Sequence, residues 1–493
     1  MSISSEIDPV RYEFSILNLY KFGIGPSSSH TIAPMLAASN FCLTIMNAGL
    51  LHRVSSVTIS LRGSMSQVSG KGHKTPRAIL LGLEMFEPSK IGREQIDEVY
   101  RRICDTHQLN FAGTTPVSFD FDHDIRGNPQ PTNEHYNASM IFQTYDDSNQ
   151  LVFEKEYYSI GGGYISSPDD GCAVGGDPIV QADRHDRLIV HSATDVFGAI
   201  REGPLDVIAW VRTYEQRFGI FRTEDQIARH LDLVIETMSG DITLGRSNTL
   251  KHLEGYMTYP VVAPELFQNL ERLRSLGREG TMEYDLSLLQ AGAIAVSEIN
   301  AVGYDRMVTA PTCGACGVIP SLVNYLIEKY HATTEQLRNF LTVAALIGTL
   351  ARLNASISGS DVGCQGEIGV ATAMGAGAMC WFLGGTIGQI EAGASHALQQ
   401  FLGMTCDPIA GYVQIPCINR NAFGATTAVG SAILAINTPL SQLGYVRYDA
   451  VIEAVKRSGY YMPTDLKETS RDGLARTVKK ANLRAKLIGK EIT

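Results

Sequence analysis

IGVATAMGAGAMCWFLGGTIG, the stretch from Ile368 to Gly388, contains no charged residue and is long enough to cross a bilayer. It is also rich in small residues, which let neighbouring helices pack closely in a protein core. Acidic Glu367 and Glu391 flank it, and no lysine or arginine lies close by to fix an orientation in a membrane. We therefore predict a buried helix of an all-helical core rather than a membrane span.

The chain around this stretch carries helical signals from about Ala193 onwards. TEDQ (Thr223–Gln226) and TTEQ (Thr333–Gln336) are capping boxes, in which a threonine and a glutamine satisfy the first amides of a helix. Apolar residues follow both at helical spacing. The sequence therefore predicts a helical bundle for this part of the chain.

The first third of the sequence is different. SVTISL (Ser56–Leu61) and PVSFDF (Pro116–Phe121) alternate apolar and polar residues, which is the period of a half-buried strand. Helical patterns lie at residues 32–46 and 77–84. We predict a mixed α/β domain here.

The boundary between the two parts is predicted from composition. Residues 161–178 are dominated by glycine, aspartate, serine and proline, as in a loop or linker. A chain of 493 residues is also too long for one hydrophobic core. We predict an α+β protein, with a mixed α/β domain and its linker over residues 1–185 and an all-helical domain over residues 186–493.

Composition and charge restrict the possible partners. The net charge is −10 and no block of basic residues stands out, which argues against nucleic acid or an anionic membrane as the main partner. The first residues have no apolar region behind a basic stretch, so we do not expect secretion. Nine cysteines then indicate a cytoplasmic protein whose thiols are buried, catalytic or metal-bound.

Three cysteines lie in loop-like segments, and each alone would more often be a buried apolar residue than a ligand. They are Cys364 in SGSDVGCQGEIG, Cys406 in GMTCDP and Cys417 in VQIPCINRNA. Three thiolates have a chemical purpose together, because thiolates are the preferred ligands of an iron–sulfur cluster. An iron left without a protein ligand would be an open Lewis acid that helps a hydroxyl group to leave.

A C-x-x-C pair, Cys313 and Cys316 in APTCGACGVIP, allows a redox or a zinc-site interpretation. No second pair accompanies it, and the strand–helix–strand context of a thioredoxin is missing. We favour a tight turn before a helix.

Several polar motifs allow two interpretations each. GIGPSSSHT (Gly23–Thr31) is either a set of helix caps or a carboxylate site with His30 beside it. The glycine loop SGKGHKTP carries Lys71 and His73, either as solvated turn residues or as a cation and an imidazole delivered to a substrate; it lacks the Walker A spacing. NASISGSD (Asn354–Asp361) is either a plain loop or a hydroxyl-rich turn that binds a carboxylate.

Together these segments resemble the iron–sulfur-dependent, single-chain L-serine dehydratases (L-serine ammonia-lyases) over about Ser15 to Ala475. The resemblance rests on motifs in a fixed order: GIGPSSSHT, KGH, H-x-N, YYSIGGG, APT-x-GA-x-G-x-IP, NASISG, GCQGE, TCDP and PCI. It implies a β-type domain followed by a helical α-type domain, and one [4Fe–4S] cluster held by Cys364, Cys406 and Cys417. The implied reaction converts L-serine to pyruvate and ammonia, a step of serine catabolism that can feed gluconeogenesis.

The chain departs from the family pattern in three places. Cys313 stands where many members have asparagine, and SHALQQFLG (Ser395–Gly403) replaces an acidic segment and displaces His396. After SRDGLA (Ser470–Ala475) the chain continues without the tail cysteine that plugs the active site of many members. We therefore expect no fourth thiolate on the cluster.

The resemblance also leads to a mechanistic hypothesis for this chain. His73 is the first candidate base, and His30 and His135 are the next candidates. Lys71, on the same loop as His73, is a further catalytic candidate. The substrate carboxylate would be held by the serine cluster and the NASISG turn, that is by Ser27, Ser28, Ser29, Thr31, Asn354, Ser356 and Ser358.

Further expectations are L-serine as the small-molecule substrate, no pyridoxal phosphate, no nucleic-acid or membrane partner, and a homodimer. Two alternatives remain open. One is a related lyase of β-hydroxy or β-thiol amino acids with altered specificity. The other is a non-catalytic amino-acid-binding paralog.

Overall fold

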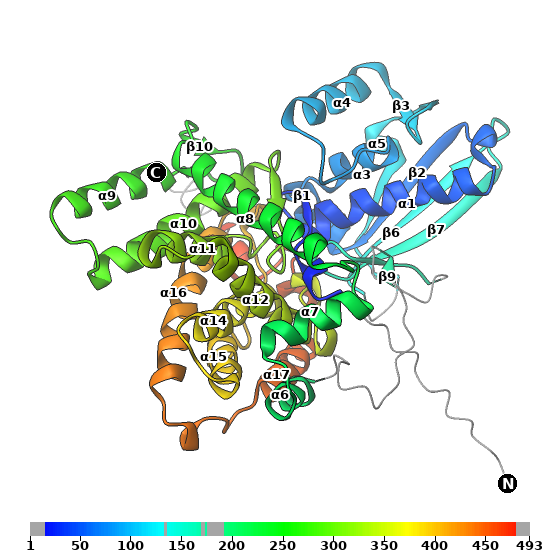
Figure 1. Ribbon diagram of the computed structural model, residues 1–493. Coiled ribbons are helices and arrows are strands. Elements are labelled where there is room, and N and C mark those ends of the chain that lie inside the picture. Colours follow the sequence, from blue (N-terminus) through cyan, green and yellow to red (C-terminus); the bar gives the residue numbers. More distant parts are fainter. Residues whose placement is uncertain (1–14, 133–135, 169–172, 175–191, 480–493) are drawn as a thin grey trace, which may run out of the picture.

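The computed structural model describes residues 15–132, 136–168, 173–174 and 192–479. A sheet with its helices forms the N-terminal part, and the C-terminal part is mostly helical, which confirms the predicted α+β class (Figure 1). The predicted domain boundary at residues 185 and 186 lies outside the described residues, as does the chain beyond residue 479.

The sheet is built around β2 (Ser56–Gly63), whose side chains alternate between half-buried and buried, as the SVTISL pattern predicts. β2 pairs in antiparallel fashion with β6 (Ala138–Tyr145), which in turn pairs with β7 (Leu151–Ser159). The other strands of this sheet are β3 (Gln108–Phe111), β4 (Thr115–Ser118), β5 (Ile125–Asn128), β8 (Ile165–Ser166) and β9 (Ala173–Val174).

The second predicted strand is only half right. β4 ends at Ser118, and Phe121 begins the short helix α5 (Phe121–Asp124). The Asp120 carboxylate accepts hydrogen bonds from the backbone N–H groups of Asp122 and His123, so it caps a helical turn where the alternation predicted continued strand.

Two helices of the N-terminal part agree with the sequence patterns. α1 (Ala33–Asn47) and α3 (Thr75–Leu83) pack against each other, and Phe41 of α1 stacks on Phe142 of the sheet at 5.2 Å between ring centroids. The short α2 (Val68–Gly72) precedes α3, and α4 (Arg93–Thr106) follows it. A shared apolar core thus holds α1 and α3 against the sheet.

The C-terminal part is a helical assembly with a small hairpin whose strands have two residues each, β10 (His252–Leu253) and β11 (Tyr259–Pro260). Its helices are α6 (Ala193–Glu202), α7 (Val207–Phe218), α8 (Glu224–Arg246), α9 (Ala263–Ser275), α10 (Met282–Val302), α11 (Val318–Tyr330), α12 (Thr334–Asn354), α13 (Gly359–Val362), α14 (Val370–Phe382), α15 (Ile387–Gln399), α16 (Cys417–Asn437) and α17 (Tyr448–Tyr461). Both predicted capping boxes are present, at the starts of α8 and α12.

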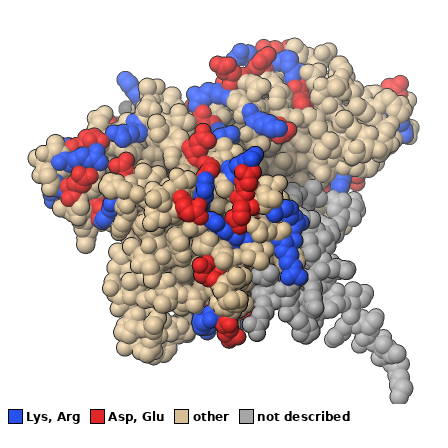
Figure 2. Space-filling model, viewed as in Figure 1, with Lys and Arg blue, Asp and Glu red and all other residues tan. Residues whose placement is uncertain are grey.

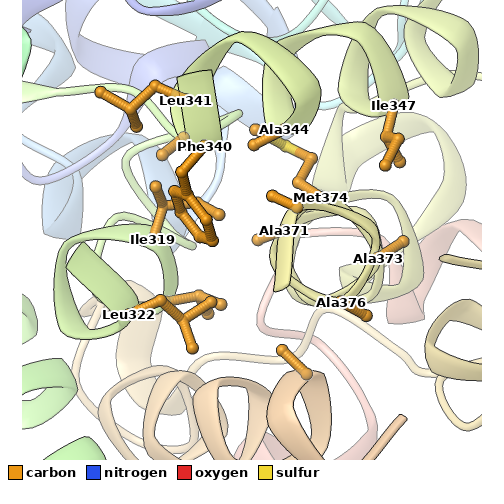
Figure 3. Close-up of a cluster of buried hydrophobic side chains, with 14 of the residues drawn as sticks. Ile319, Leu322, Phe340, Leu341, Ala344, Ile347, Ala371, Ala373, Met374 and Ala376 are labelled. Atoms are coloured by element: carbon orange, nitrogen blue, oxygen red, sulfur yellow. The ribbon is translucent and has the colours of Figure 1, made fainter. Parts of the chain in front are cut away.

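The uncharged stretch forms the buried helix α14, as predicted (Figure 3). Met374 and Ala371 of α14 lie beside Phe340 and Ala344 of α12, and the small size of the two alanines allows the helices to approach closely. The helix is shorter than the stretch, because the chain turns after Phe382 at a left-handed Gly384 (φ 82°) before α15 begins. Among the described helices, none is both long and apolar enough to span a bilayer.

The first described residues pack with the helical part. β1 (Phe22–Ile24) pairs in antiparallel fashion with β12 (Arg306–Val308), and the Tyr20 hydroxyl donates a hydrogen bond to the Leu341 carbonyl. The chain then enters the N-terminal sheet domain through the turn at Ser27. The serine cluster is therefore held where the two parts of the protein meet.

Candidate active site

The three predicted cysteines come from three separate segments of the helical part and are all buried. Cys364 follows α13, Cys406 lies after α15, and Cys417 is the first residue of α16. The Sγ atoms of Cys364 and Cys406 each lie 3.9 Å from Oε2 of Glu367. Burial, followed by the nearby charge of Cys364, raises the pKa of the Cys417 thiol. The fold therefore gathers thiols that are far apart in the sequence.

The backbone approaches Cys406 and Glu367 closely at two glycines. A Cβ atom on Gly359 would lie 3.1 Å from the Cys406 Sγ and 2.7 Å from Oε2 of Glu367. A Cβ atom on Gly314 would lie 2.8 Å from the other carboxylate oxygen of Glu367. Glycines at both positions thus let two loops close around the cysteine cluster.

Glu367 is a site residue that the sequence did not single out. It lies in a π-helical turn (Gln365–Gly369) that begins directly after Cys364 and leads into α14. Its Oε1 accepts a hydrogen bond from the Thr312 hydroxyl at 2.8 Å, and burial raises its pKa. Cys364, Glu367 and Cys406 have ligand atoms within 4.8 Å of one another, a grouping that could hold a metal ion.

One arginine supplies positive charge beside the thiols. Arg420 lies on α16 one turn after Cys417, and its guanidinium donates a hydrogen bond to the Thr405 carbonyl at 2.8 Å. Burial lowers its pKa, but the charges of Cys364 and Cys417 outweigh burial and raise the pKa overall. A fixed cation on this helix therefore favours the thiolate forms that bind metals.

The serine cluster is a π-helical turn (Ser28–Ile32) that leads into α1, and all of its residues are buried. Ser27 is the N-cap and accepts a hydrogen bond from the His30 N–H, so the capping interpretation of this motif is correct for Ser27. The Thr31 hydroxyl donates to the His73 carbonyl at 2.7 Å. This turn therefore ties the serine cluster to the glycine loop.

His30 and His73 lie side by side, with 4.9 Å between their ring centroids. The Nδ1 of His30 lies 2.8 Å from the Ser29 hydroxyl, and its Nε2 lies 3.0 Å from the Ser64 hydroxyl. Ser64 also donates to the Asn137 carbonyl, which brings this residue of the H-x-N motif close to His30. His135 of that motif lies outside the described residues.

The environment keeps both imidazoles neutral. Burial lowers the pKa of His73 to about 3, and a hydrogen bond with the Ser69 backbone only partly opposes this. Burial, and then the neighbouring His73, lower the pKa of His30 well below its ordinary value. The Nδ1 of His73 is buried and has no hydrogen-bond partner among the described residues.

Glu468, which follows α17, faces both histidines and was not predicted from the sequence. Its Oε1 lies 3.4 Å from Nδ1 of His30 and 3.9 Å from Nε2 of His73. Ser29 donates a hydrogen bond to its carboxylate at 3.2 Å. Burial, and then the charge of Glu367, raise the pKa of Glu468 well above its ordinary value.

The glycine loop of the N-terminal part packs against the cysteine-bearing loops. Gly72 lies against the carbonyl of Gly411 so closely that no side chain would fit between them. The Ser69 hydroxyl lies 3.1 Å from the Ser470 hydroxyl, which donates to the Pro408 carbonyl. Lys71, the candidate cation of this loop, is exposed, whereas His73 is buried.

The NASISG turn lies next to the IGGG loop. A Cβ atom on Gly161, which has a left-handed φ of 86°, would come within 3.1 Å of the Ser358 side chain. Ser358 is buried and its hydroxyl lies 2.8 Å from that of Ser360, while the Ser356 hydroxyl donates to Asp361. Asn354 ends α12 and its amide donates to the Leu350 carbonyl of the same helix.

The C-x-x-C pair forms a turn before α11, as predicted. Cys313 and Cys316 are buried, and the Cys313 carbonyl accepts a hydrogen bond from the Asn300 amide at 3.1 Å. Burial, and then the charge of Glu367, raise the pKa of Cys313 above its usual range. Cys313 therefore borders the cysteine cluster.

The two parts of the chain match two known protein families. The serine dehydratase beta chain family matches residues 15–170, and the serine dehydratase alpha chain family matches residues 154–475. An L-serine dehydratase of Streptomyces coelicolor is 36% identical over 463 residues, which cover 94% of this chain and 98% of the relative. One from Helicobacter pylori is 33% identical (94% and 99% covered), and L-serine dehydratase 2 of Escherichia coli is 34% identical (94% and 98% covered). The chain therefore belongs to the serine dehydratase family, with its beta-chain and alpha-chain parts joined in one polypeptide.

Proposed function

We propose that this protein is an iron–sulfur-dependent L-serine dehydratase that converts L-serine to pyruvate and ammonia. The observation that carries the proposal is the buried group of Cys364, Cys406 and Cys417, which shares Glu468 as a neighbour with the histidine pair. The names of the relatives support serine as the substrate.

The donor set suits an iron–sulfur cluster. Three thiols and a nearby arginine match the soft ligands and the compensating charge that such a cluster requires. Cys364, Cys406 and Cys417 would hold it, and Gly359, which has no side chain, lies next to Cys406. When bound, the cluster supplies a Lewis-acidic iron that polarises the β-hydroxyl of serine.

The proton at Cα of serine is only weakly acidic, so a base must lie close to it. His73 is a better candidate than His30, because its Nδ1 has no hydrogen-bond partner in the described part of the chain, while both nitrogens of His30 contact serine hydroxyls. Its lowered pKa keeps it neutral and able to accept a proton at neutral pH. We assign proton transfer to the His73 imidazole, and His30 is the second candidate.

The substrate carboxylate requires hydrogen-bond donors next to these groups. Two hydroxyl-rich turns support this role: Ser27 to Thr31 at the start of α1, and Asn354 to Ser358 at the end of α12. The first turn also presents backbone N–H groups at the start of a helix, where anions bind well. We assign the carboxylate to these two turns.

A pyridoxal-phosphate mechanism is the alternative enzymatic mechanism, and it would need a lysine inside the candidate active site. Lys71 on the glycine loop would be the candidate for this lysine, and its side chain is exposed. Anaerobic purification with an iron and sulfide count and an absorption spectrum separates the two. Broad absorption with iron and sulfide supports the proposal, and a sharp aldimine band would refute it.

A lyase with altered specificity is the second candidate, because Cys313 borders the cysteine cluster. A panel of L-serine, L-threonine and L-cysteine, assayed under argon for keto-acid release, tests both the reaction and its selectivity. Serine as the best substrate supports the proposal. If protein that contains the cluster releases keto acid from none of the three, a non-catalytic amino-acid-binding paralog is indicated.

We also propose that the protein is a cytoplasmic homodimer. Phe423, Ile433 and Leu434 of α16 are exposed, and the surface over α14, α15 and α16 carries few charged side chains (Figure 2). Exposed apolar areas of this kind often form contacts between subunits. Light scattering during size-exclusion chromatography should give twice the mass of the chain, and the monomer mass would contradict this.

A further inference from the structure

The backbone of Glu468 is fixed to the loop that carries Cys406. The Glu468 N–H donates a hydrogen bond to the Cys406 carbonyl at 2.7 Å, and the Cys406 N–H donates to the Leu466 carbonyl at 2.9 Å. Glu468 itself has a left-handed φ of 58°, a conformation uncommon for a residue with a side chain. The surrounding contacts therefore hold this residue in one place.

The side chain of Glu468 reaches residues of the N-terminal part. It is buried, and the Ser29 hydroxyl contacts both of its oxygens, at 3.2 and 3.4 Å. Its Oε1 also faces ring nitrogens of His30 and His73. One carboxyl group from the helical part thus contacts three polar residues of the N-terminal part.

We propose that Glu468 is a positioning residue that fixes the imidazoles of His30 and His73 relative to the Cys406 loop. It acts through the Ser29 hydroxyl, which bridges to Nδ1 of His30, and through its own contact with Nε2 of His73. The inference rests on the proposed function, because it concerns how the catalytic base is aligned with an L-serine substrate bound beside the cysteines.

The physical reason is that few polar contacts orient the ring of His73. Its Nδ1 has no partner among the described residues, so Glu468 is the contact that orients its ring from the helical side. Removing the carboxyl group would free the ring to rotate and would leave the Ser29 hydroxyl without its acceptor. Displacement of a catalytic group by about 1 Å can cost on the order of 10²-fold in rate.

Glu468→Ala and Glu468→Gln test this, with Glu391→Gln as the matched control. Glu391 is also a buried carboxylate of the helical part, but it pairs with Arg447 at 2.9 Å. Each protein is supplied with iron and sulfide under anaerobic conditions, and the bound iron and sulfide are counted. The kcat for L-serine is then expressed per cluster, and KM is measured. The isotope effect on kcat with serine deuterated at Cα reports directly on proton removal.

Glu468→Ala should lower kcat per cluster by on the order of 10²-fold, raise the isotope effect, and change KM much less. Glu468→Gln keeps an oxygen that accepts from Ser29, so its kcat should stay within about tenfold of the wild type. Glu391→Gln should lower the thermal midpoint and leave both kcat and the isotope effect unchanged.

Three results would overturn the inference: wild-type kcat in Glu468→Ala, a loss of kcat there with an unchanged isotope effect, or equal losses in Glu468→Ala and Glu468→Gln. The second would assign Glu468 a structural role, and the third would assign the effect to its charge. A wild-type protein that binds no cluster or does not turn over serine would instead refute the proposed function.

Discussion

Gly72 and Gly411 touch backbone to backbone, so that a Cβ atom on Gly72 would overlap the Gly411 carbonyl oxygen. Gly72 precedes His73 in the N-terminal part, and Gly411 lies in the loop between Cys406 and Cys417. This contact therefore sets how closely the histidine loop approaches the cysteine loops.

Gly72→Ala should move the histidine loop away from the cysteines. We expect kcat to fall by roughly 10²-fold, since a small displacement of a catalytic group has an effect of that size, while the iron content stays close to that of the wild type. Gly240→Ala is the control, because a Cβ atom there meets nothing within 4 Å. Full activity in Gly72→Ala would mean that the contact does not set the catalytic geometry.

Cys364→Ala, Cys406→Ala and Cys417→Ala should each lose both the cluster and turnover, because all three thiolates are needed to hold it. Replacement of Cys42, Cys380 or the exposed Cys104 by alanine should leave the cluster in place and cost at most a few kcal/mol of stability. Cys172, for which we predict the same, lies outside the described residues.

Iron and sulfide counts after anaerobic purification measure these effects. Full iron content in any one of the first three variants would remove that cysteine from the ligand set. Loss of iron in Cys313→Ser would mean that the ligand set has been misassigned.

Arg420→Gln should weaken cluster retention, since it removes the positive charge next to Cys364 and Cys417. Outer residues around metal sites typically contribute about 10- to 100-fold in metal affinity or activity. The half-life of the cluster in the presence of an iron chelator should therefore shorten about tenfold. Arg420→Lys keeps the charge and serves as the control; equal half-lives in the wild type and Arg420→Gln would exclude this role.

His73 should make the protein less stable in acid. Its pKa is about 3 in the folded protein against 6.5 ordinarily, so the unfolded chain binds a proton more readily between these values. The stability from this group is fully present above pH 6.5 and is lost as pH falls towards 3, by at most about 1.4 kcal/mol per pH unit.

His73→Gln should remove this dependence, so that urea unfolding at pH 5 and pH 7 differs less than in the wild type. His52→Gln, which removes an exposed imidazole, should keep the wild-type difference. The same pH difference in His73→Gln and the wild type would show that His73 is not neutral in the folded protein.

Local patterns in the sequence predicted much of the fold. The alternation at Ser56–Leu61, the capping boxes at Thr223 and Thr333, and the small residues of α14 all specify structure through neighbours in the chain. The pairing of Phe22–Ile24 with Arg306–Val308 could not be predicted, because strand partners so far apart leave no periodic signal.

The site shows the same division between local and distant contacts. Cys364, Cys406 and Cys417 were identified through motifs of the family, and the structure brings them together. Glu367 had a weak local signal, since it lies three residues after Cys364 on the same turn. Glu468 had none, because its partner Ser29 lies 439 residues away in the sequence.

An anaerobic assay of pyruvate release, made alongside iron and sulfide counts, decides whether an iron–sulfur cluster is required for serine dehydration by this protein. We predict four irons and four sulfides per chain and pyruvate formation from L-serine. Both should be lost together on exposure to oxygen and regained together with iron, sulfide and thiol. Pyruvate release that persists in protein freed of iron would contradict the account.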